Sequence, residues 1–390
     1  MEKIRIYHFH NGGGGGVLSV IRNLLRFSSD ADIENHVIYT INKDSHPSGY
    51  PVNRLDGASS ERVFYYSPNW NFYYTCRRLA RLLPDDKAII VAHDWLELGM
   101  ASSLGLNNPV VQFLHGDYPY YYQLAEKHRS CIDMQIAVSR TISEKLKKLE
   151  PERAGSIVHK YFPVPFVKAN EYPVNGVNII YIVRDINDES KNFRLLPAIN
   201  NLLAEKGIRV HWTVVGTGKT DEEFRQAWGQ QENYTYFRGL PNERLLELLA
   251  AHHLFILPSF NEGLPVTVVE AMKAGCIPLI SDWGGATDEL VVDGLNGYYL
   301  KPDDSHGYAR KIAQLYADRE LMISMAANAL KNANELFDPY KNTSGIEEAI
   351  LRSRKFSASK VPQRVYGSRL DQRWIPNFFT KMIRSLNILK

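Results

Sequence analysis

Two glutamates frame a tight turn in the segment FNEGLPVTVVE, which runs from residue 260 to residue 270. Glu262 and Glu270 stand eight positions apart, one on each side of a Gly-Leu-Pro sequence. The preceding run, HHLFILPS, has the length and apolar character of a buried strand, and the residues after the proline have helical spacing. Because the start of a helix after a glycine turn is a common ligand-binding setting, the two carboxylates are candidate binding groups.

The turn itself predicts an anion site at the start of the helix. Pro265 suits the first helical position, where its missing N–H costs nothing. Gly263 lets the backbone approach a ligand closely. Four amides between Leu264 and residue 268, that of Val266 among them, have no expected partner within the helix. Together with the helix dipole these amides attract negative charge.

Glu270 shares one face of the expected helix with that anion site. It follows Val266 by four positions and Thr267 by three, which places the three side chains together. A carboxylate about one turn below an anion site suits the two hydroxyls of a ribose better than a second anion. The layout predicts a ribose at Glu270, a diphosphate on the amides and a sugar near Glu262. The spacing fits equally well a capped helix with Glu262 at its dipole and Glu270 solvated.

Strands and helices alternate along the chain in two runs, one from KIRIYHF to RTISEKLKKL and one from VNIIYIV to CIPLISD. Between them, YFPVPFVKANEYPVNG contains three prolines and no periodicity, which predicts a linker. Such alternation is typical of parallel sheets, so we expect an α/β protein with two doubly wound, Rossmann-like domains facing across a cleft. The expected divisions are a first domain, a linker, a second domain and a crossover segment with a basic tail, at residues 1–165, 166–176, 177–337 and 338–390.

Composition and cysteine usage are typical of a globular protein in a reducing compartment. The chain has 390 residues, of which 44% are hydrophobic and 23% are charged. Its three cysteines include no C-x-x-C pair, which argues against a disulfide framework. The first residues, MEKIRIYHFH, indicate a strand rather than a signal peptide, and no apolar run is long enough to span a membrane. We therefore expect a cytoplasmic protein.

The second domain resembles the donor-binding half of the retaining glycosyltransferases of family 4, which have the GT-B fold. The Glu-x7-Glu motif of that family matches Glu262 and Glu270. Its Gly-Gly, Glu and Asp-Gly-x-Asn-Gly segment matches Gly284, Gly285, Glu289, Asp293, Gly294, Asn296 and Gly297. The resemblance is strong over residues 177–305 and weaker over residues 1–165. It implies that Glu270 holds the ribose of a nucleotide sugar, Glu262 holds a sugar hydroxyl, and the amides between them meet the diphosphate.

The same resemblance implies two cations at the diphosphate, since the family has an Arg after the first strand of this domain and a Lys shortly after it. The segment YIVRDINDESKNF offers Arg184 and Lys191. Cations there would stabilise the negative charge of the departing nucleoside diphosphate. The chain departs from the family at Val183, where a glycine is usual, and in a longer gap to the lysine. The alternative is a solvated loop in which Lys191 pairs with Asp188 or Glu189.

Two further turns are candidates on the donor side. The segment VVGTGK places Gly216 at another strand end, where a plain tight turn would explain it almost as well. By resemblance, the segment YFRGL puts Arg238 and Leu240 near the nucleotide base, largely through backbone contacts.

In the first domain, the glycine run at residues 12–16 follows the first strand and precedes a helix. It is not a phosphate-binding P-loop, and it lacks the last glycine of the dinucleotide fingerprint. The family has a glycine-rich loop here under the transferred sugar, which makes Gly14 and Gly15 candidates; a merely flexible loop is the alternative. His115 ends the apolar run PVVQFLH, and family members carry a histidine here beside the donor sugar, although a lone histidine is usually structural.

Aromatic residues gather in two segments of the first domain. The segment DYPYYYQL contains Tyr118, Tyr120 and Tyr121, and FYYSPNWNFYYTCRRLAR contains Trp70 and three arginines. Aromatic faces stack on sugar rings and arginines bind phosphate, so both segments are candidates for the acceptor side. Ordinary packing and a solvated helix face are the alternatives.

The resemblance implies transfer of a hexosyl unit with retention from a nucleoside-diphosphate sugar to a saccharide or lipid-linked acceptor, as in cell-surface polysaccharide or glycolipid synthesis. No nucleophile is evident, and the family is described as needing none. No Asp-x-Asp motif stands at a strand end, so we expect neither a metal nor a further cofactor. Nucleic acid is not an expected partner. A nucleotide-sugar epimerase of related fold and a non-catalytic nucleotide-sugar-binding subunit are the alternatives.

The C-terminal tail has its own chemistry. Residues 352–390 contain ten Lys and Arg but one acid, Asp371. Its apolar residues recur every four positions and predict an apolar stripe of Trp374, Phe378, Met382 and Leu386. Such a stripe beside cations is typical of a helix that lies at a membrane surface, so residues 368–390 predict peripheral contact with an anionic membrane on its cytoplasmic face. The alternative is that the stripe packs against the first domain. The resemblance to the GT-B fold implies that much of residues 338–365 crosses back to that domain.

Overall fold

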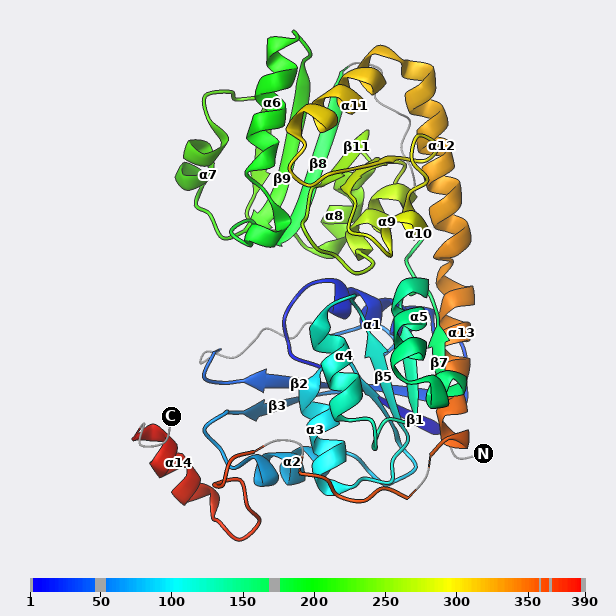
Figure 1. Cartoon of the computed structure of the whole chain (residues 1–390), viewed down its shortest axis with the longest axis vertical. Helices are drawn as coiled ribbons and strands as arrows, with labels where there is room; N and C mark the ends of the chain where they lie inside the picture. Colours follow the sequence, from blue (N-terminus) through cyan, green and yellow to red (C-terminus); the bar gives the residue numbers. More distant parts are fainter. Residues whose placement is uncertain (1–2, 46–53, 168–175, 358, 365–366, 387–390) are drawn as a thin grey trace. The chain divides into compact units, whose positions relative to one another are not determined.

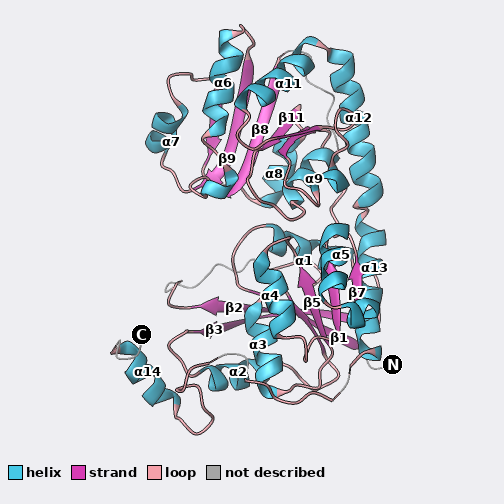
Figure 2. Cartoon of the chain, viewed as in Figure 1, coloured by secondary structure: helices cyan, strands magenta, loops and turns pink. Residues whose placement is uncertain are grey.

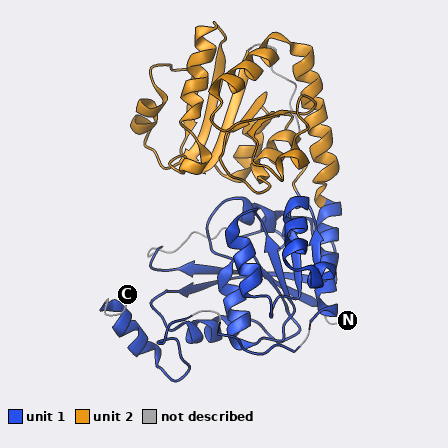
Figure 3. Cartoon of the chain, in the orientation of Figure 1, with its two compact units in different colours: residues 1–163, 340–390 blue, residues 164–339 orange. Residues whose placement is uncertain are grey.

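The computed structural model describes residues 3–45, 54–167, 176–357, 359–364 and 367–386. The chain forms two compact units. Unit 1 contains residues 1–163 and 340–390, and unit 2 contains residues 164–339 (Figure 3). Most of the predicted linker, residues 168–175, lies outside the described residues.

Unit 1 is built on a seven-stranded sheet with the order β3-β2-β1-β4-β5-β6-β7, in which all neighbours are parallel. The strands are β1 (Ile4–His10), β2 (Ile33–Asn42), β3 (Ser60–Tyr66), β4 (Ile89–Ala92), β5 (Val110–Leu114), β6 (Met134–Ala137) and β7 (Ile157–His159). Every residue of β4, β5 and β6 is buried, as expected for a parallel sheet that is covered on both faces.

The helices of this unit lie between its strands in the chain or, from α13 on, after the last strand of unit 2 (Figures 1 and 2). They are α1 (Gly16–Phe27), α2 (Phe72–Ala80), α3 (Trp95–Leu104), α4 (Pro119–Lys127), α5 (Arg140–Leu149), η1 (Pro151–Ser156), α13 (Pro339–Arg352), η3 (Ser353–Lys355) and α14 (Asn377–Ser385). Local signals fix several of their starts. Asp94 and Glu97 form a capping box at α3, and the Ser139 hydroxyl accepts from the N–H of Ile142 at α5.

Unit 2 is built on a six-stranded parallel sheet with the order β10-β9-β8-β11-β12-β13. Its strands are β8 (Val177–Asp185), β9 (Val210–Thr217), β10 (Tyr234–Phe237), β11 (Leu254–Leu257), β12 (Ile277–Ser281) and β13 (Tyr298–Leu300). Its helices are η2 (Glu189–Lys191), α6 (Leu195–Glu205), α7 (Asp221–Trp228), α8 (Asn242–Leu249), α9 (Val266–Lys273), α10 (Thr287–Leu290), α11 (Ser305–Ala317) and α12 (Arg319–Leu336).

The two doubly wound parallel sheets confirm the predicted fold class. The predicted return of the C-terminal segment to the first domain is also confirmed, because residues 340–390 belong to unit 1. In that segment Nζ of Lys360 lies 2.6 Å from the carboxylate of Asp133, and both side chains are buried. Among the described residues, no helix is long and apolar enough to cross a membrane.

Candidate functional site

The candidate residues of unit 2 lie at the carboxyl ends of its strands, where the chain order of the strands reverses. β8 is the first strand of this unit, with β9 on one side and β11 on the other. The connections after β8 and β11 leave the sheet in opposite directions, and ligands of doubly wound sheets bind at this switch point. Arg184, Lys191, Glu262 and Glu270 all stand at the end of one of these two strands or in the connection that follows it.

Lys191 and Glu262 form an ion pair that joins the two connections. Nζ of Lys191 lies 2.7 Å from Oε1 of Glu262, and the side chains are 23% and 10% exposed. Lys191 ends η2, which the Asp188 carboxylate caps by accepting from the N–H of Ser190. The N–H of Phe260 donates to the carbonyl of Ser190 over 2.8 Å and holds the two connections together. Lys191 therefore pairs with the other candidate and not with a carboxylate of its own loop.

The helix that carries Glu270 begins one residue later than expected. Pro265 is the N-cap of α9 with φ −71° and ψ 120°, and Val266 is the first helical residue. Proline fixes φ but leaves ψ free, so it can serve as an extended cap as well as a first helical residue. The N–H of Val268 donates to the carbonyl of Pro265 over 3.2 Å. Fewer amides remain for an anion than the four expected from the sequence.

Glu270 is buried on α9, with 4% of its surface exposed. Gly263 and Leu264, in the turn before α9, are buried as well. The alternative in which Glu270 is solvated is therefore wrong. A buried carboxylate requires hydrogen-bond donors, and the two hydroxyls of a ribose can donate to it.

The other donor-side candidates lie along the same edge of the sheet. Arg184 is exposed at the end of β8. Gly216 lies near the end of β9, where a Cβ atom would come within 2.9 Å of the carbonyl oxygen of Val183. This close approach gives the glycine a packing role, independent of any ligand. Arg238 and Leu240 follow β10, which is the outermost strand on that side of the sheet.

The Asp-Gly-x-Asn-Gly segment builds the turn before β13. The side chain of Asn296 is buried, and its Oδ1 atom accepts from the N–H of Val292 over 2.7 Å. Its Nδ2 atom donates to the carbonyl of Leu290 over 3.1 Å. Gly294 has φ 77°, a conformation that favours glycine. This part of the motif is thus explained by the fold.

Unit 1 presents its candidate residues at the corresponding edge. β1 lies between β2 and β4, so its carboxyl end is again a switch point. Gly12 and Gly15 have φ 83° and 116° in the loop between β1 and α1. A Cβ atom added at Gly14 or Gly15 would meet no atom within 4 Å. The loop therefore has free space on this side, as the predicted sugar-binding role requires.

His115 is the outer end of a row of histidines that crosses the sheet edge. Its Nε2 atom lies 2.7 Å from Nδ1 of His93, which follows β4. Nε2 of His93 lies 3.3 Å from Nδ1 of His8 on β1, and Nε2 of His8 lies 3.4 Å from Oδ1 of Asn35 on β2. His8 and His93 are 2% and 4% exposed, whereas His115 is partly accessible. We call these three residues the histidine row.

The far end of the histidine row determines which nitrogen atoms carry protons. The amide group of Asn35 donates to the Ser28 hydroxyl over 3.2 Å, and this hydroxyl donates to the Glu347 carboxylate on α13. Oδ1 of Asn35 can only accept, so a neutral His8 donates from Nε2 and accepts at Nδ1. His93 must then donate from Nε2 to Nδ1 of His8, which leaves its own Nδ1 as an acceptor. His115 therefore donates from Nε2 to Nδ1 of His93. Nδ1 of His115 is then left as an acceptor.

Burial keeps the histidine row neutral near pH 7. It lowers the pKa of His8 to about 4 and that of His115 to about 3, and it holds the pKa of His93 well below its usual value. Burial also lowers the pKa of the adjacent His10 to about 4. A neutral imidazole with a free Nδ1 atom is suited to accepting a hydrogen bond from a hydroxyl group, and it adds no charge beside a sugar.

Of the candidate tyrosines, Tyr121 lies beside His115 and Tyr120 contacts Asp94. The ring of Tyr121 is 6.3 Å from the imidazole of His115, and the Tyr120 hydroxyl donates to the Asp94 carboxylate. The ring of Tyr118 covers Gly116 so closely that a Cβ atom there would lie 2.4 Å from it. These aromatic side chains therefore line the edge of the sheet after β5.

Trp70 lies in a different place. It follows β3, and three strands separate β3 from β5 in the sheet, which corresponds to roughly 19 Å at the usual strand spacing. Its ring contacts three cations, with Lys43, Arg78 and Lys381 at 4.6, 5.0 and 4.8 Å from the ring centroid. The structure therefore does not bring Trp70 together with Tyr118, Tyr120 and Tyr121.

Sequence reasoning missed His8, His93 and Asn35 as functional residues. His8 and His93 stand in or directly after the apolar strands β1 and β4, and a histidine in such a run was the available signal. Their partners could not be identified, because strand order decides which of these residues become neighbours.

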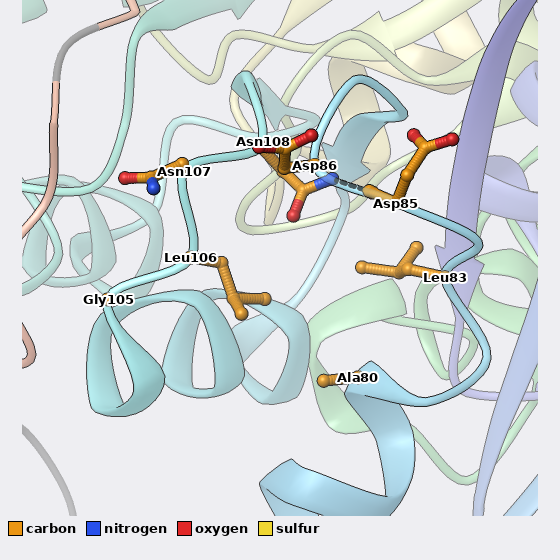
Figure 4. A pocket seen from close by; sticks show the side chains of 8 residues that line it. All are labelled: Ala80, Leu83, Asp85, Asp86, Gly105, Leu106, Asn107 and Asn108. Atoms are coloured by element: carbon orange, nitrogen blue, oxygen red, sulfur yellow. Dashed lines mark hydrogen bonds between the residues drawn. The ribbon is translucent and has the colours of Figure 1, made fainter.

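Among the described residues, no group of three His, Cys, Asp or Glu side chains could hold a metal ion. A pocket in unit 1 is lined by Leu83, Asp85, Asp86 and residues 105–108 (Figure 4), together with Ala80. Asp85 and Asn108 precede β4 and β5, so this pocket lies at the amino ends of the strands. It is therefore at the opposite edge of the sheet from the histidine row.

Two family profiles match the chain. One, described as glycosyl transferases group 1, matches residues 167–332, and the other, described as glycosyltransferase family 4, matches residues 14–158. Among curated relatives, an N,N'-diacetylbacillosaminyl-diphospho-undecaprenol alpha-1,3-N-acetylgalactosaminyltransferase of Campylobacter jejuni is 26% identical over 46% of this chain and 48% of its own length. The putative teichuronic acid biosynthesis glycosyltransferase TuaC of Bacillus subtilis is 24% identical over 68% of this chain and 70% of its own length. The match thus spans about half of the Campylobacter protein.

Solved structures share the fold. HepE from Anabaena, in complex with UDP and glucose, superimposes with a TM-score of 0.70 at 17% identity, over 90% of this chain and 100% of that chain. A TarM variant from S. aureus, in complex with UDP and other ligands, gives a TM-score of 0.69 at 14% identity, over 90% of this chain and 99% of that chain. At these identities the likeness concerns the fold alone.

Proposed function

Because the chain belongs to the glycosyltransferases of group 1 and family 4, we propose that it transfers a hexosyl unit with retention from a nucleoside-diphosphate sugar to a saccharide or lipid-linked acceptor. The observation that carries this proposal is the Lys191–Glu262 ion pair at the switch point of unit 2, next to the helix of the buried Glu270. A cation, a carboxylate and a helix start are the groups that a nucleotide sugar requires there.

Unit 2 would bind the nucleotide. Glu270 accepts from the ribose hydroxyls, while the first amides of α9, Arg184 and Lys191 surround the diphosphate. Lys191 is already held in place by Glu262, so it needs little reorganisation to meet the charge that grows on the leaving group. Glu262 in turn accepts from a hydroxyl of the sugar.

Unit 1 would contribute neutral groups. Nδ1 of His115 accepts from a sugar hydroxyl, and the open side of Gly14 and Gly15 leaves space for the ring. With leaving group and acceptor on one face of the sugar, a phosphate oxygen takes the acceptor proton. The protein then supplies position and electrostatics rather than a nucleophile.

Relatives support a surface glycan as the product. The Campylobacter relative is named for an undecaprenol-linked acceptor and the Bacillus relative for teichuronic acid, and UDP is bound in both structural relatives. A UDP-sugar and a lipid-linked saccharide are therefore the first substrates to test. Contact with nucleic acid has no role in this reaction.

The test is calorimetric titration with UDP, GDP and ADP, followed by incubation of the preferred nucleotide's sugars with saccharide and lipid-linked acceptors. We expect one nucleotide to bind and one sugar to be transferred, with the α or β configuration retained. Activity should persist in EDTA, since cations and amides take the place of a metal. Isomerised free nucleotide sugar would instead indicate an epimerase, and binding without turnover on any acceptor would indicate a non-catalytic subunit.

A further inference from the structure

The C-terminal helix α14 is fastened to unit 1 by polar groups next to α2 (Figure 1). The side-chain amide of Asn71, the N-cap of α2, donates to the carbonyls of Leu370, Gln372 and Ile375 over 3.0, 3.0 and 2.9 Å. The backbone N–H of Asn71 donates to Oδ1 of Asn377 over 2.8 Å. Asn71 is fully buried, and its one side chain holds three backbone carbonyls of the tail at once.

A second set of contacts fixes the rotation of the helix. Asp371 pairs with Arg384 at 2.6 Å and accepts from the N–H of Phe72 over 2.7 Å. Arg384 also donates to the carbonyl of Trp70 over 2.7 Å. Thr380 is fully buried and donates to a carbonyl of the tail. These polar contacts hold one particular side of α14 against unit 1.

The opposite side of the tail is apolar and exposed. Trp374 is 72% exposed, Phe378 68%, Phe379 49%, Met382 43% and Leu386 58%. The alternative that this stripe packs against the first domain is therefore wrong, although the helix itself does dock there. An amphipathic helix normally buries its apolar side. Here the polar side is buried and the apolar side is presented outward, so the surface is built for another partner. We call these five residues the tail face.

Positive charge gathers beside α14, around the ring of Trp70. Lys381 on α14, Arg78 on α2 and Lys43 after β2 all lie against the ring of Trp70, within 5.0 Å of its centroid. Among the described residues, none of these three cations forms an ion pair with a carboxylate. Three like charges on one ring repel one another, so an anionic partner would stabilise them.

We propose that the tail face and its three cations dock on an anionic lipid bilayer. Exposed Trp, Phe, Met and Leu side chains on a short helix can enter the boundary between headgroups and acyl chains, while lysine and arginine meet the phosphates. A helix of nine residues lies in this boundary and does not cross the bilayer. The docking rests on the tail, α2 and Lys43 and does not depend on the transfer reaction.

The test uses the full chain with vesicles of phosphatidylcholine alone and of phosphatidylcholine with 30% phosphatidylglycerol, in co-sedimentation at low and high salt. We expect the protein to pellet with the anionic vesicles and to be released by salt. The variant Phe378→Ser/Met382→Ser should bind about tenfold more weakly. The variant Arg78→Gln/Lys381→Gln should lose about fivefold for each charge and should show a weaker dependence on salt.

Matched controls separate the tail face from general surface effects. Leu149→Ser and Lys148→Gln change an exposed apolar residue and an exposed cation elsewhere in unit 1, and they should leave binding unchanged. Brominated lipids should quench the fluorescence of the full chain, and Trp374→Phe should remove most of this quenching. Nucleotide binding should be the same in all variants, which shows that each is folded and that the proposed function is tested separately.

Three results would overturn the proposal. One is that the full chain stays in the supernatant with anionic vesicles at low salt. Another is that the tail-face variants pellet as well as the two controls. The third is that sedimentation velocity shows a dimer that Phe378→Ser/Met382→Ser dissociates, because a second copy of the chain would then be the occupant of the tail face.

Discussion

The two units use the same architecture to present opposite chemistry. Each is a doubly wound parallel sheet with its candidate residues at the carboxyl ends of strands, beside a switch point. In unit 2 these residues are charged, and Lys191 and Glu262 form a close ion pair. In unit 1 they are neutral, because burial lowers the pKa of His8 and His115 to about 4 and about 3.

This difference shows that the fold positions side chains at the carboxyl ends of the strands, whereas the residue types found there decide the chemistry. Charged groups at the edge of unit 2 suit a diphosphate, whose negative charge increases when the sugar bond breaks. Neutral donors and acceptors at the edge of unit 1 suit hydroxyl groups. The predictions below separate the two units by their chemistry, with the largest expected effect first.

Acid should destabilise unit 1 more than unit 2. His8 and His10 have a pKa of about 4 in the native state and about 6.5 when unfolded, so between these pH values the unfolded chain binds more protons. The neutral histidines contribute roughly 3 kcal/mol each to the free energy of unfolding above about pH 6.5, and this contribution is lost as the pH falls to about 4. In unit 2, burial likewise lowers the pKa of His252 to about 4.

Pulsed hydrogen exchange, after equilibration at each pH from 7 to 4, would measure this difference for the two units separately. The peptides of unit 1 should lose protection at the higher pH. Equal midpoints, or earlier unfolding of unit 2, would contradict the role assigned to the buried histidines.

Glu262→Gln should have the largest effect on catalysis. It removes the charge that holds Lys191 and the acceptor for the sugar hydroxyl, so turnover should fall by about 100-fold or more. Affinity for the free nucleoside diphosphate should fall less than turnover, because this ligand lacks the sugar for which we propose Glu262 as an acceptor, and Lys191 keeps its charge. Steady-state kinetics and titration calorimetry together would test this, with Glu222→Gln on the exposed surface of α7 as a control. An equal loss of nucleotide affinity would place Glu262 at the diphosphate instead.

Glu270→Gln should weaken nucleotide binding by about tenfold, the scale of a hydrogen bond to a charged group. The wild-type protein should prefer UDP over 2′-deoxy-UDP, and the variant should lose most of this preference, because both changes remove the same contact. Calorimetry on the four combinations of wild type or variant with UDP or 2′-deoxy-UDP gives the coupling free energy between the two changes. Additive losses would mean that Glu270 does not contact the ribose.

Gly14→Ala should have the smallest effect. A Cβ atom at Gly14 meets no protein atom within 4 Å and the backbone needs no positive φ there, so thermal stability should not change. If the proposed sugar site is there, a methyl group in that space should nevertheless reduce turnover several-fold and leave UDP affinity intact. Gly155→Ala, at another open position in unit 1, is the matched control. Unchanged turnover would show that the loop is only a flexible connection.

Local patterns predicted those parts of the site in which the residues are close in the sequence. Alternating apolar runs predicted both sheets, and the Gly-Leu-Pro turn between Glu262 and Glu270 predicted a helix start there. The start of α9 was misplaced by one residue, because a proline fits either the cap or the first helical position. The tail shows a similar limit. Its apolar stripe was visible in the sequence, but whether unit 1 buries the polar or the apolar side depends on Asn71, about 300 residues away.

The sequence by itself determined the fold class and the residue types at each strand end, since these depend on periodicity and local turn chemistry. The family resemblance added the expected C-terminal return to the first unit. Only the tertiary structure decided the partners. Lys191 meets Glu262 because β8 and β11 are neighbours, and His115 meets His93 because β4 and β5 are neighbours. Strand order brings together side chains that are far apart along the chain, and hydrogen bonds and ion pairs act over only a few ångströms. The chemistry of both edges therefore exists only in the folded sheets.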